Sequence, residues 1–156
     1  MATKYMFRGI SNLNIDSKGR IAIPTKYRDE IKSEHEGEMI VTVDHGEKCL
    51  VLYPMAKWLD TEQALMGLPN LSDAVRDMKR LILGHASDVV MDAQGRIMLA
   101  TPLREYAELD KKLIMIGQGD KFELWDEESW NSGRESMRKA APINIQNDES
   151  LKGLSI

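Results

Sequence analysis

Two stretches of the chain, NIDSKGRIAIP and VVMDAQGRIMLA, share the pattern Asp-x-x-Gly-Arg. In the first stretch these residues are Asp16, Gly19 and Arg20. An aspartate side chain can accept hydrogen bonds from the backbone amides just ahead of it, and glycine tolerates a positive φ, so Asp and Gly suffice to build a tight turn. The arginine is not needed for the turn and therefore requires another explanation. The second copy consists of Asp92, Gly95 and Arg96.

Two roles are open for the arginine that follows each glycine. It can pair with the aspartate of its own turn, although a surface ion pair of this kind contributes only about 0–1 kcal/mol. It can instead point outward, where a guanidinium binds phosphates or the O6 and N7 atoms of guanine. Lys18 adds a second cation to the first turn, whereas Gln94 stands at the matching place in the second. The first copy is therefore the better candidate for binding an anionic polymer.

The similarity of the two stretches continues along the chain and indicates an internal repeat. Ile21, Thr25 and Arg28 match residues 76 positions later, and LVLYP matches FELWD at an offset of 72. The four-residue difference places an insertion near KSEHEGE in the first copy. We therefore expect two homologous units, a helical connector and a polar C-terminal helix or tail. These four segments are residues 10–57, 86–129, 58–85 and 130–156.

Both units have the same predicted order of elements. A strand, the turn and a second strand are followed by a short helix at Pro24 or Pro102, because proline is tolerated at the start of a helix. A hairpin ends each unit, as MIVTVD with CLVLYP and as KLIMIG with KFELWD. The connector has apolar residues at helical spacing, with Ser72 as an N-cap. The last residues, from KAAPINIQ onward, lack a clear period and are expected to form a loose tail.

Length and composition limit the class of protein. The chain has 156 residues, and its 42% hydrophobic and 29% charged content is typical of a globular domain. A unit of about 45 residues cannot bury much core alone, so the two units must pack on each other or on another chain. No apolar run approaches the roughly 20 residues that span a bilayer. A single cysteine and the lack of an apolar segment in MATKYMFRGI favour a cytoplasmic protein.

The charge of the chain is unevenly distributed. Its net charge is −4, yet residues 1–28 hold six lysines and arginines against one acid, a local charge of +5. A basic segment on an acidic body can still produce a positive surface for nucleic acid. The alternative is a random scatter of surface lysines and arginines.

Residue patterns for catalysis or cofactor binding are missing from the sequence. His35, His45 and His85 do not have the spacing of metal ligands, and Cys49 lies in an apolar, strand-like run. Neither a Walker A loop nor a G-x-G-x-x-G loop is present. We therefore expect a protein that is not an enzyme, with no metal, no cofactor and no small-molecule substrate.

Three segments together resemble the bacterial MraZ family: MFRGISNLNIDSKGRIAIPTKYRD, DAQGRIMLATPLREYAEL and GQGDKFELWDEESW. That family belongs to the AbrB-like, swapped-hairpin superfamily of DNA-binding proteins. The resemblance implies a mixed α+β, β-rich fold with two pseudo-symmetric AbrB-like swapped-hairpin β-barrel repeats, short helices and a helical connection. The family usually begins at the MFRG sequence found here at Met6, so MATKY is an extension or a different start.

The resemblance also implies a function. MraZ proteins are transcriptional regulators that bind G-containing direct repeats in the promoter of the division and cell-wall gene cluster. They generally repress this cluster, including their own gene. They assemble as rings, commonly octamers or dodecamers. Double-stranded promoter DNA and further copies of the chain are therefore the expected partners, and the expected location is the nucleoid in the cytoplasm.

The residues and the resemblance together predict a DNA-binding mechanism. The family's D-x-x-x-R motif falls on both turns, and Arg20 is expected to enter the major groove at guanines. Arg96 is a second candidate, either for DNA contact or for support of the ring interface. The alternative is an antitoxin-like oligomeric scaffold that binds proteins through its acidic body, without base readout. The expected phosphate contacts are Arg8, Lys18, Lys26 and Arg28.

Overall fold

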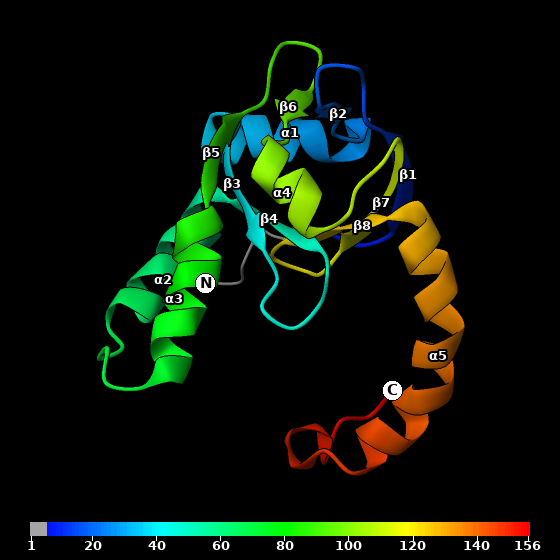
Figure 1. Cartoon of the computed structure of the whole chain (residues 1–156). Helices are drawn as coiled ribbons and strands as arrows, with labels where there is room; N and C mark the ends of the chain where they lie inside the picture. The colour runs from blue at the N-terminus through cyan, green and yellow to red at the C-terminus, as the bar shows by residue number, and fades with distance from the viewer. Residues whose placement is uncertain (1–5) are drawn as a thin grey trace.

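The computed structural model describes residues 6–156 (Figure 1). The first repeat contains two short strands, a helix and a hairpin, in the order expected from the sequence. The helix begins at Thr25, directly after Pro24. The elements of this repeat are β1 (Ile10–Asn14), β2 (Arg20–Ala22), α1 (Thr25–His35), β3 (Glu38–Val43) and β4 (Leu50–Pro54).

The second repeat has the same order of elements. Its short helix has Pro102 in the first turn, where the missing N–H of proline costs no helical hydrogen bond. Its elements are β5 (Ser87–Val90), β6 (Arg96–Met98), α4 (Thr101–Tyr106), β7 (Lys112–Gly117) and β8 (Phe122–Asp126).

The strands of the two repeats are exchanged in one antiparallel sheet of order β1-β7-β8-β4-β3-β5. The first strand of each repeat pairs with the hairpin of the other, β1 with β7 and β5 with β3. The two hairpins join where β4 pairs with β8. Neither repeat could form this sheet alone, because the first strand of each repeat pairs with the hairpin of the other repeat. The expectation that the units pack on each other is confirmed.

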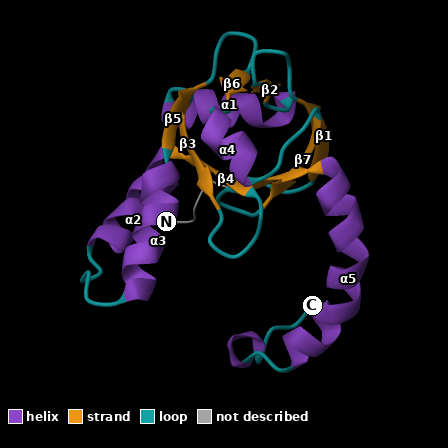
Figure 2. Ribbon diagram, in the orientation of Figure 1, coloured by secondary structure: helices purple, strands orange, loops and turns teal. Residues whose placement is uncertain are grey.

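The expectation of two β-barrels is wrong in one respect, because the sheets formed by residues 6–156 do not close. The six-stranded sheet ends at β1 and β5, and β2 pairs only with β6 in a separate two-stranded sheet. The curved sheet instead wraps around α1 and α4 (Figure 2). Each repeat contributes too few strands for a barrel of its own, and its first strand is used by the other repeat.

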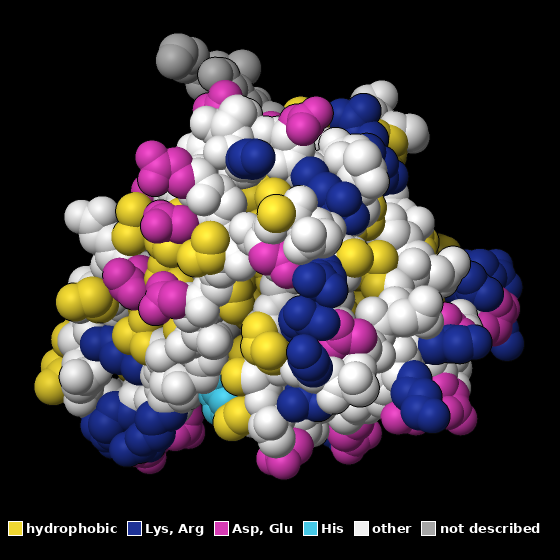
Figure 3. All heavy atoms as spheres, turned by 90° about the horizontal axis from the view of Figure 1, so that it is seen from above, with side chains coloured by type: hydrophobic (Ala, Val, Ile, Leu, Met, Phe, Trp, Pro, Cys, Tyr) yellow, Lys and Arg dark blue, Asp and Glu magenta, His cyan; other side chains and the backbone are white. Residues whose placement is uncertain are grey.

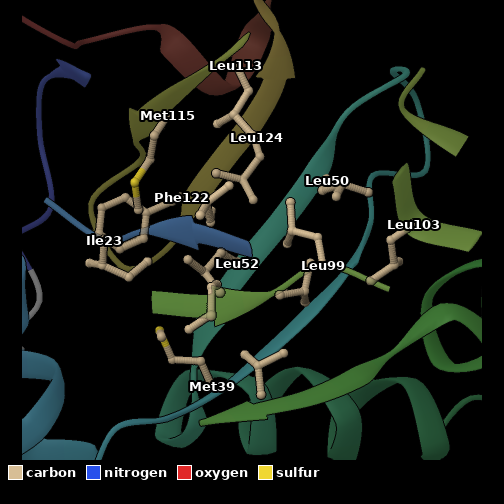
Figure 4. Close-up of a cluster of buried hydrophobic side chains, with 14 of the residues drawn as sticks. Ile23, Met39, Leu50, Leu52, Leu99, Leu103, Leu113, Met115, Phe122 and Leu124 are labelled. Carbon is tan, nitrogen blue, oxygen red and sulfur yellow. The ribbon is translucent and has the colours of Figure 1, made fainter. Parts of the chain in front are cut away.

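The β2–β6 pair relates the two repeats by local twofold symmetry. Ile21 lies directly opposite Ile97, the residue that follows it by 76 positions. Both side chains are buried in a single core cluster that also takes in the hairpins of both repeats. Figure 4 shows this mixture, with Leu52 and Phe122 among the labelled side chains. The core therefore belongs to the two repeats jointly.

Three helices lie outside the sheet (Figure 1). The connector forms α2 (Met55–Met66) and α3 (Asp73–His85), and the Ser72 Oγ accepts a hydrogen bond from the Val75 N–H at 3.2 Å, as expected for an N-cap. On the opposite side of the molecule, α5 (Glu127–Gln146) continues through Pro142 and is followed by a short 3-10 helix, η1 (Glu149–Leu151). The helix thus extends into the segment expected to form a loose tail.

The shared core leads to a prediction about unfolding. Ile21→Ala should lower the free energy of unfolding by about 2–5 kcal/mol, because it removes buried methyl groups and leaves a cavity. Urea unfolding followed by circular dichroism should still show one transition. The control is Met98→Ala, because Met98 is 48% exposed and its replacement should cost no more than about 0.5 kcal/mol. Two separate transitions in Ile21→Ala would contradict a common core.

Candidate nucleic-acid interface

The first turn, residues 15–20, is organised by the Asp16 carboxylate. Its Oδ1 accepts hydrogen bonds from the N–H groups of Lys18 and Arg20, each at 2.9 Å. Its Oδ2 accepts one from the Arg20 Nε at 2.8 Å. Gly19 closes the turn with φ +82°, a conformation in which a β-carbon would be strained. The Asp16 carboxylate therefore binds both the backbone of the turn and the Nε of Arg20.

The second turn, residues 91–96, has the same geometry. The Asp92 Oδ1 accepts from the N–H groups of Gln94 and Arg96 at 2.9 and 2.8 Å, and its Oδ2 accepts from the Arg96 Nε at 3.0 Å. In both turns the hydrogen bond from the arginine backbone is the main cause that lowers the pKa of the aspartate. The arginine side chain adds to this effect.

The two roles considered for the arginine use different atoms of one guanidinium. In Arg20 the Nε is engaged by Asp16, while neither Nη has a hydrogen-bond partner among residues 6–156. The side chain of Arg20 is 25% exposed. A guanidinium carries five N–H donors, so fixing one at Nε orients the remaining four without consuming them. The ion pair thus leaves Arg20 able to bind an external ligand.

The two turns differ in their remaining donors. Arg96 is more exposed, at 34%, but its Nη2 donates to the Gln94 Oε1 at 3.3 Å. The corresponding residue in the first turn is Lys18, an exposed cation whose side chain makes no such bond with any of residues 6–156. The first turn therefore offers two cations with free donors, and the second offers one that is partly occupied.

Arg28 does not lie beside the turn of its own repeat. Its Nε donates to the Ile23 carbonyl at 2.7 Å, and its guanidinium lies against Gly95 of the second turn. Arg104, which was not among the sequence candidates, has the matching position against Gly19 of the first turn. Its offset of 76 from Arg28 was the signal that could have identified it. The glycine of each turn thus lies against an arginine of the other repeat.

Two other sequence candidates lie apart from the turns. The Tyr27 hydroxyl donates to the Arg8 carbonyl, and the Lys26 Nζ lies 4.9 Å from the centre of the Tyr27 ring. Arg8 precedes β1 and Asp16 follows it, a separation of roughly 25 Å of extended chain. Arg8 and Lys26 thus form a second basic position near the start of β1. Lys4, counted in the basic N-terminal segment, lies outside the described residues.

The two turns also differ in the charged residues that line a shallow hollow beside each of them. The first hollow contains three cations and two acids, and the second contains two cations and three acids. Lys111 and Lys112 of the first hollow also border acids at the start of α5. The charged residues of the first are Asp16, Arg104, Asp110, Lys111 and Lys112. Those of the second are Arg28, Asp29, Lys32, Glu36 and Asp92.

The surface that carries both turns is called the turn face here. Viewed from above, lysine and arginine side chains form an interrupted band across its middle, with acids between and beside them (Figure 3). The net charge of the whole chain conceals this local pattern. A band of cations on a rigid support is suited to a polyanion.

One group of side chains among the described residues could hold a metal ion. It consists of Asp44, Cys49 and Glu123, whose ligand atoms lie within 4.8 Å of one another. The Asp44 carboxylate already accepts two backbone hydrogen bonds, and burial raises the pKa of the Cys49 thiol. Because a metal ligand must be a thiolate, this buried and protonated thiol is poorly suited to the role.

The carboxylates of the turns predict a pH dependence of stability. Because the native pKa of Asp16 lies below its ordinary value of 3.8, the stabilisation it provides is complete above that value and is lost as the pH falls through the native pKa. Urea unfolding of the wild type and of Asp16→Asn, from about pH 6 down to about pH 2, should show a difference that is constant at first and then shrinks. Asp92→Asn should show the same pH dependence of the free energy of unfolding. A difference that is independent of pH would contradict the ionic role of these acids.

The fold and its site define a mixed α+β protein made of two repeats, with a basic, turn-bearing face that is suited to a polyanion. The family described as the antitoxin-like MraZ protein matches residues 6–81 and again residues 82–149. The chain therefore belongs to the MraZ family, a family of transcriptional regulators and not of enzymes.

Its similarity to other members of the family extends over almost the whole chain. A transcriptional regulator MraZ of Legionella pneumophila (strain Corby) is 51% identical over 152 residues, which cover 97% of this chain and 100% of that protein. The transcriptional regulator MraZ of Thioalkalivibrio sulfidiphilus is 46% identical over 151 residues, with the same two coverages. Among residues 6–156, none of the helices is sufficiently long and apolar to cross a bilayer.

Proposed function

We propose that this protein is a sequence-specific DNA-binding regulator that reads double-stranded promoter DNA with its first turn. The observation that carries the proposal is the state of Arg20, whose Nε is bound to Asp16 while both Nη groups remain free among the described residues. In the major groove, those groups can donate to O6 and N7 of guanine. Lys18 and, farther away, Arg8 and Lys26 are placed to neutralise phosphates and to set the register.

We infer the regulated genes from the role implied by the family resemblance. The relatives are named transcriptional regulators, and we assign this chain the family's role as a repressor of the division and cell-wall gene cluster, including its own promoter. Its sites are G-containing direct repeats, and its location is the nucleoid in the cytoplasm. Residues 10–57 and 86–129 are the two functional units, joined by 58–85 and followed by 130–156.

The proposed active form is a ring of eight or twelve copies. A ring presents several first turns to successive repeats, and weak contacts then act together because tethering raises the effective concentration of the later ones. Exposed apolar side chains on the outer helices support contacts between copies, since such groups often mark interfaces. They include Leu59 and Met66 on α2, and Met137 and Ile143 on α5, with Leu71 in the turn after α2.

The same apolar side chains also support a second candidate, an antitoxin-like scaffold that binds another protein. In that case the turn arginines would serve only their aspartates. The two candidate functions predict different effects of removing Arg20 on partner binding. A scaffold would still bind its partner protein without Arg20, whereas a DNA-binding regulator would bind its operator more weakly.

The test of the proposed function is Arg20→Ala. Operator affinity should fall by about 1–3 kcal/mol per contacted site, or roughly 5- to 150-fold, and the preference for operator over unrelated DNA should decrease. A gel-shift titration with the gene's own upstream DNA measures both. Arg96→Ala is the matched control, since it removes the same Nε bond from the second turn and should cost less. Unchanged operator binding by Arg20→Ala would favour the scaffold.

Lys18 should contribute to affinity without reading sequence. Lys18→Ala should weaken binding to all DNA alike and reduce the slope of log K against log salt by about 0.9, the value for one phosphate contact. The matched control is Gln94→Ala at the equivalent position of the second turn, which should leave the slope unaltered. A loss of sequence preference with an unaltered slope would instead assign Lys18 to base readout.

A further inference from the structure

Each turn is attached to the opposite repeat by a closed set of contacts. In the first turn, the Gly19 carbonyl accepts a hydrogen bond from the Leu99 N–H at 2.8 Å. The Leu99 carbonyl accepts one from the Arg104 Nε at 3.0 Å, and a β-carbon on Gly19 would lie 3.1 Å from the Arg104 Cζ. Arg104 therefore lies directly against the backbone of the turn that directs Arg20.

The contacts related by the local twofold axis occur at the second turn. The Gly95 carbonyl accepts from the Ile23 N–H at 2.7 Å, and the Ile23 carbonyl accepts from the Arg28 Nε at 2.7 Å. A β-carbon on Gly95 would overlap Arg28, at 2.5 Å from its Cζ. Since the arrangement occurs twice in one chain, it is a property of the fold and not of one side-chain conformation.

The position of Arg104 differs from that of Arg28 in one respect. The Arg104 Nη2 donates to the Thr101 Oγ1 at 3.0 Å, so Arg104 is fixed at two points. Within residues 6–156, Arg28 makes only its Nε bond to the Ile23 carbonyl. The more firmly held arginine is thus the one that lies against the first turn. This turn carries Lys18 and the unoccupied Nη groups of Arg20.

We infer that each turn is a composite of the two repeats, in which Arg104 positions the DNA-reading first turn and Arg28 positions the second. Arg104 acts through Gly19 by limiting the directions in which the Gly19–Arg20 backbone can lie, and it therefore orients the free end of Arg20. Arg28 has the same relation to Gly95 and Arg96. The inference rests on the proposed function, because it concerns how the turns read DNA.

Double-mutant cycles test this crossed arrangement. The measured quantity is the ratio of affinities for two fluorescent duplexes, one from the gene's own upstream repeats and one of scrambled sequence. Arg104→Ala should lower this ratio at least fivefold in the wild type and have little effect in Arg20→Ala, because both changes disable one turn. Arg28→Ala should lower the ratio less, because the second turn contributes less to DNA binding, and its effect should be lost in Arg96→Ala. The same-repeat pairs, Arg28 with Arg20 and Arg104 with Arg96, should combine multiplicatively.

Other outcomes of the cycles would overturn the inference. Coupling within repeats would mean that each arginine serves its own turn. A reduced salt slope with an unaltered ratio would make Arg104 a phosphate contact. A lower melting temperature with an unaltered ratio would give it only a structural role. A wild type that does not prefer its upstream repeats would refute the proposed function itself, which separates that failure from the others.

A measurement without DNA tests the same placement. Hydrogen–deuterium exchange reports on the amides that Asp16 and Asp92 hold in the two turns. Arg104→Ala should accelerate exchange at least fivefold in residues 18–20 and leave residues 94–96 unaltered, and Arg28→Ala should do the reverse. Arg104→Lys keeps a cation and an apolar stem near Gly19 but loses the Nε bond, and it serves if the alanine variant does not fold. Acceleration confined to the turn of the same repeat would overturn the inference.

Discussion

The antiparallel pairing of β2 with β6 is the contact on which the rest of the molecule depends. It places Ile21 opposite Ile97 and so creates the local twofold axis that relates the repeats. It also brings the two turns together on one face, because each turn leads directly into one of these strands. The exchange of β1 and β5 between the hairpins follows the same symmetry. Two units of about 45 residues, each too small for a core, thus become one domain.

The turns show how one side chain can serve both structure and recognition. A carboxylate that accepts two backbone amides and one guanidinium nitrogen holds its turn firmly while leaving the outer donors of that guanidinium available. Such preorganisation lowers the entropic cost of binding, since the arginine does not have to be ordered again by its ligand. The two turns are alike in Asp, Gly and Arg, and they differ in charge because Lys18 stands where the second turn has Gln94.

Local structure was largely predictable from the sequence. The hairpins, the helices that begin beside Pro24 and Pro102, and the Ser72 cap depend on neighbouring residues and were expected correctly. Strand partners were not predictable, because alternating apolar residues show that a strand has a buried face and not which strand lies beside it. The barrels that the family resemblance implied are replaced, among the described residues, by an open six-stranded sheet and a separate two-stranded sheet. For the same reason the sequence did not show that Arg28 lies against the turn of the other repeat.

The sequence by itself determined the repeat, the two Asp-x-x-Gly-Arg turns and the difference between Lys18 and Gln94. All of these are properties of residue type and spacing within short segments. Only the tertiary structure decided that Arg104 lies against Gly19 and Arg28 against Gly95. The physical reason is that these contacts join residues about 70–85 positions apart through the β2–β6 pair, and nothing in a local pattern specifies which copy of a repeated unit supplies the partner.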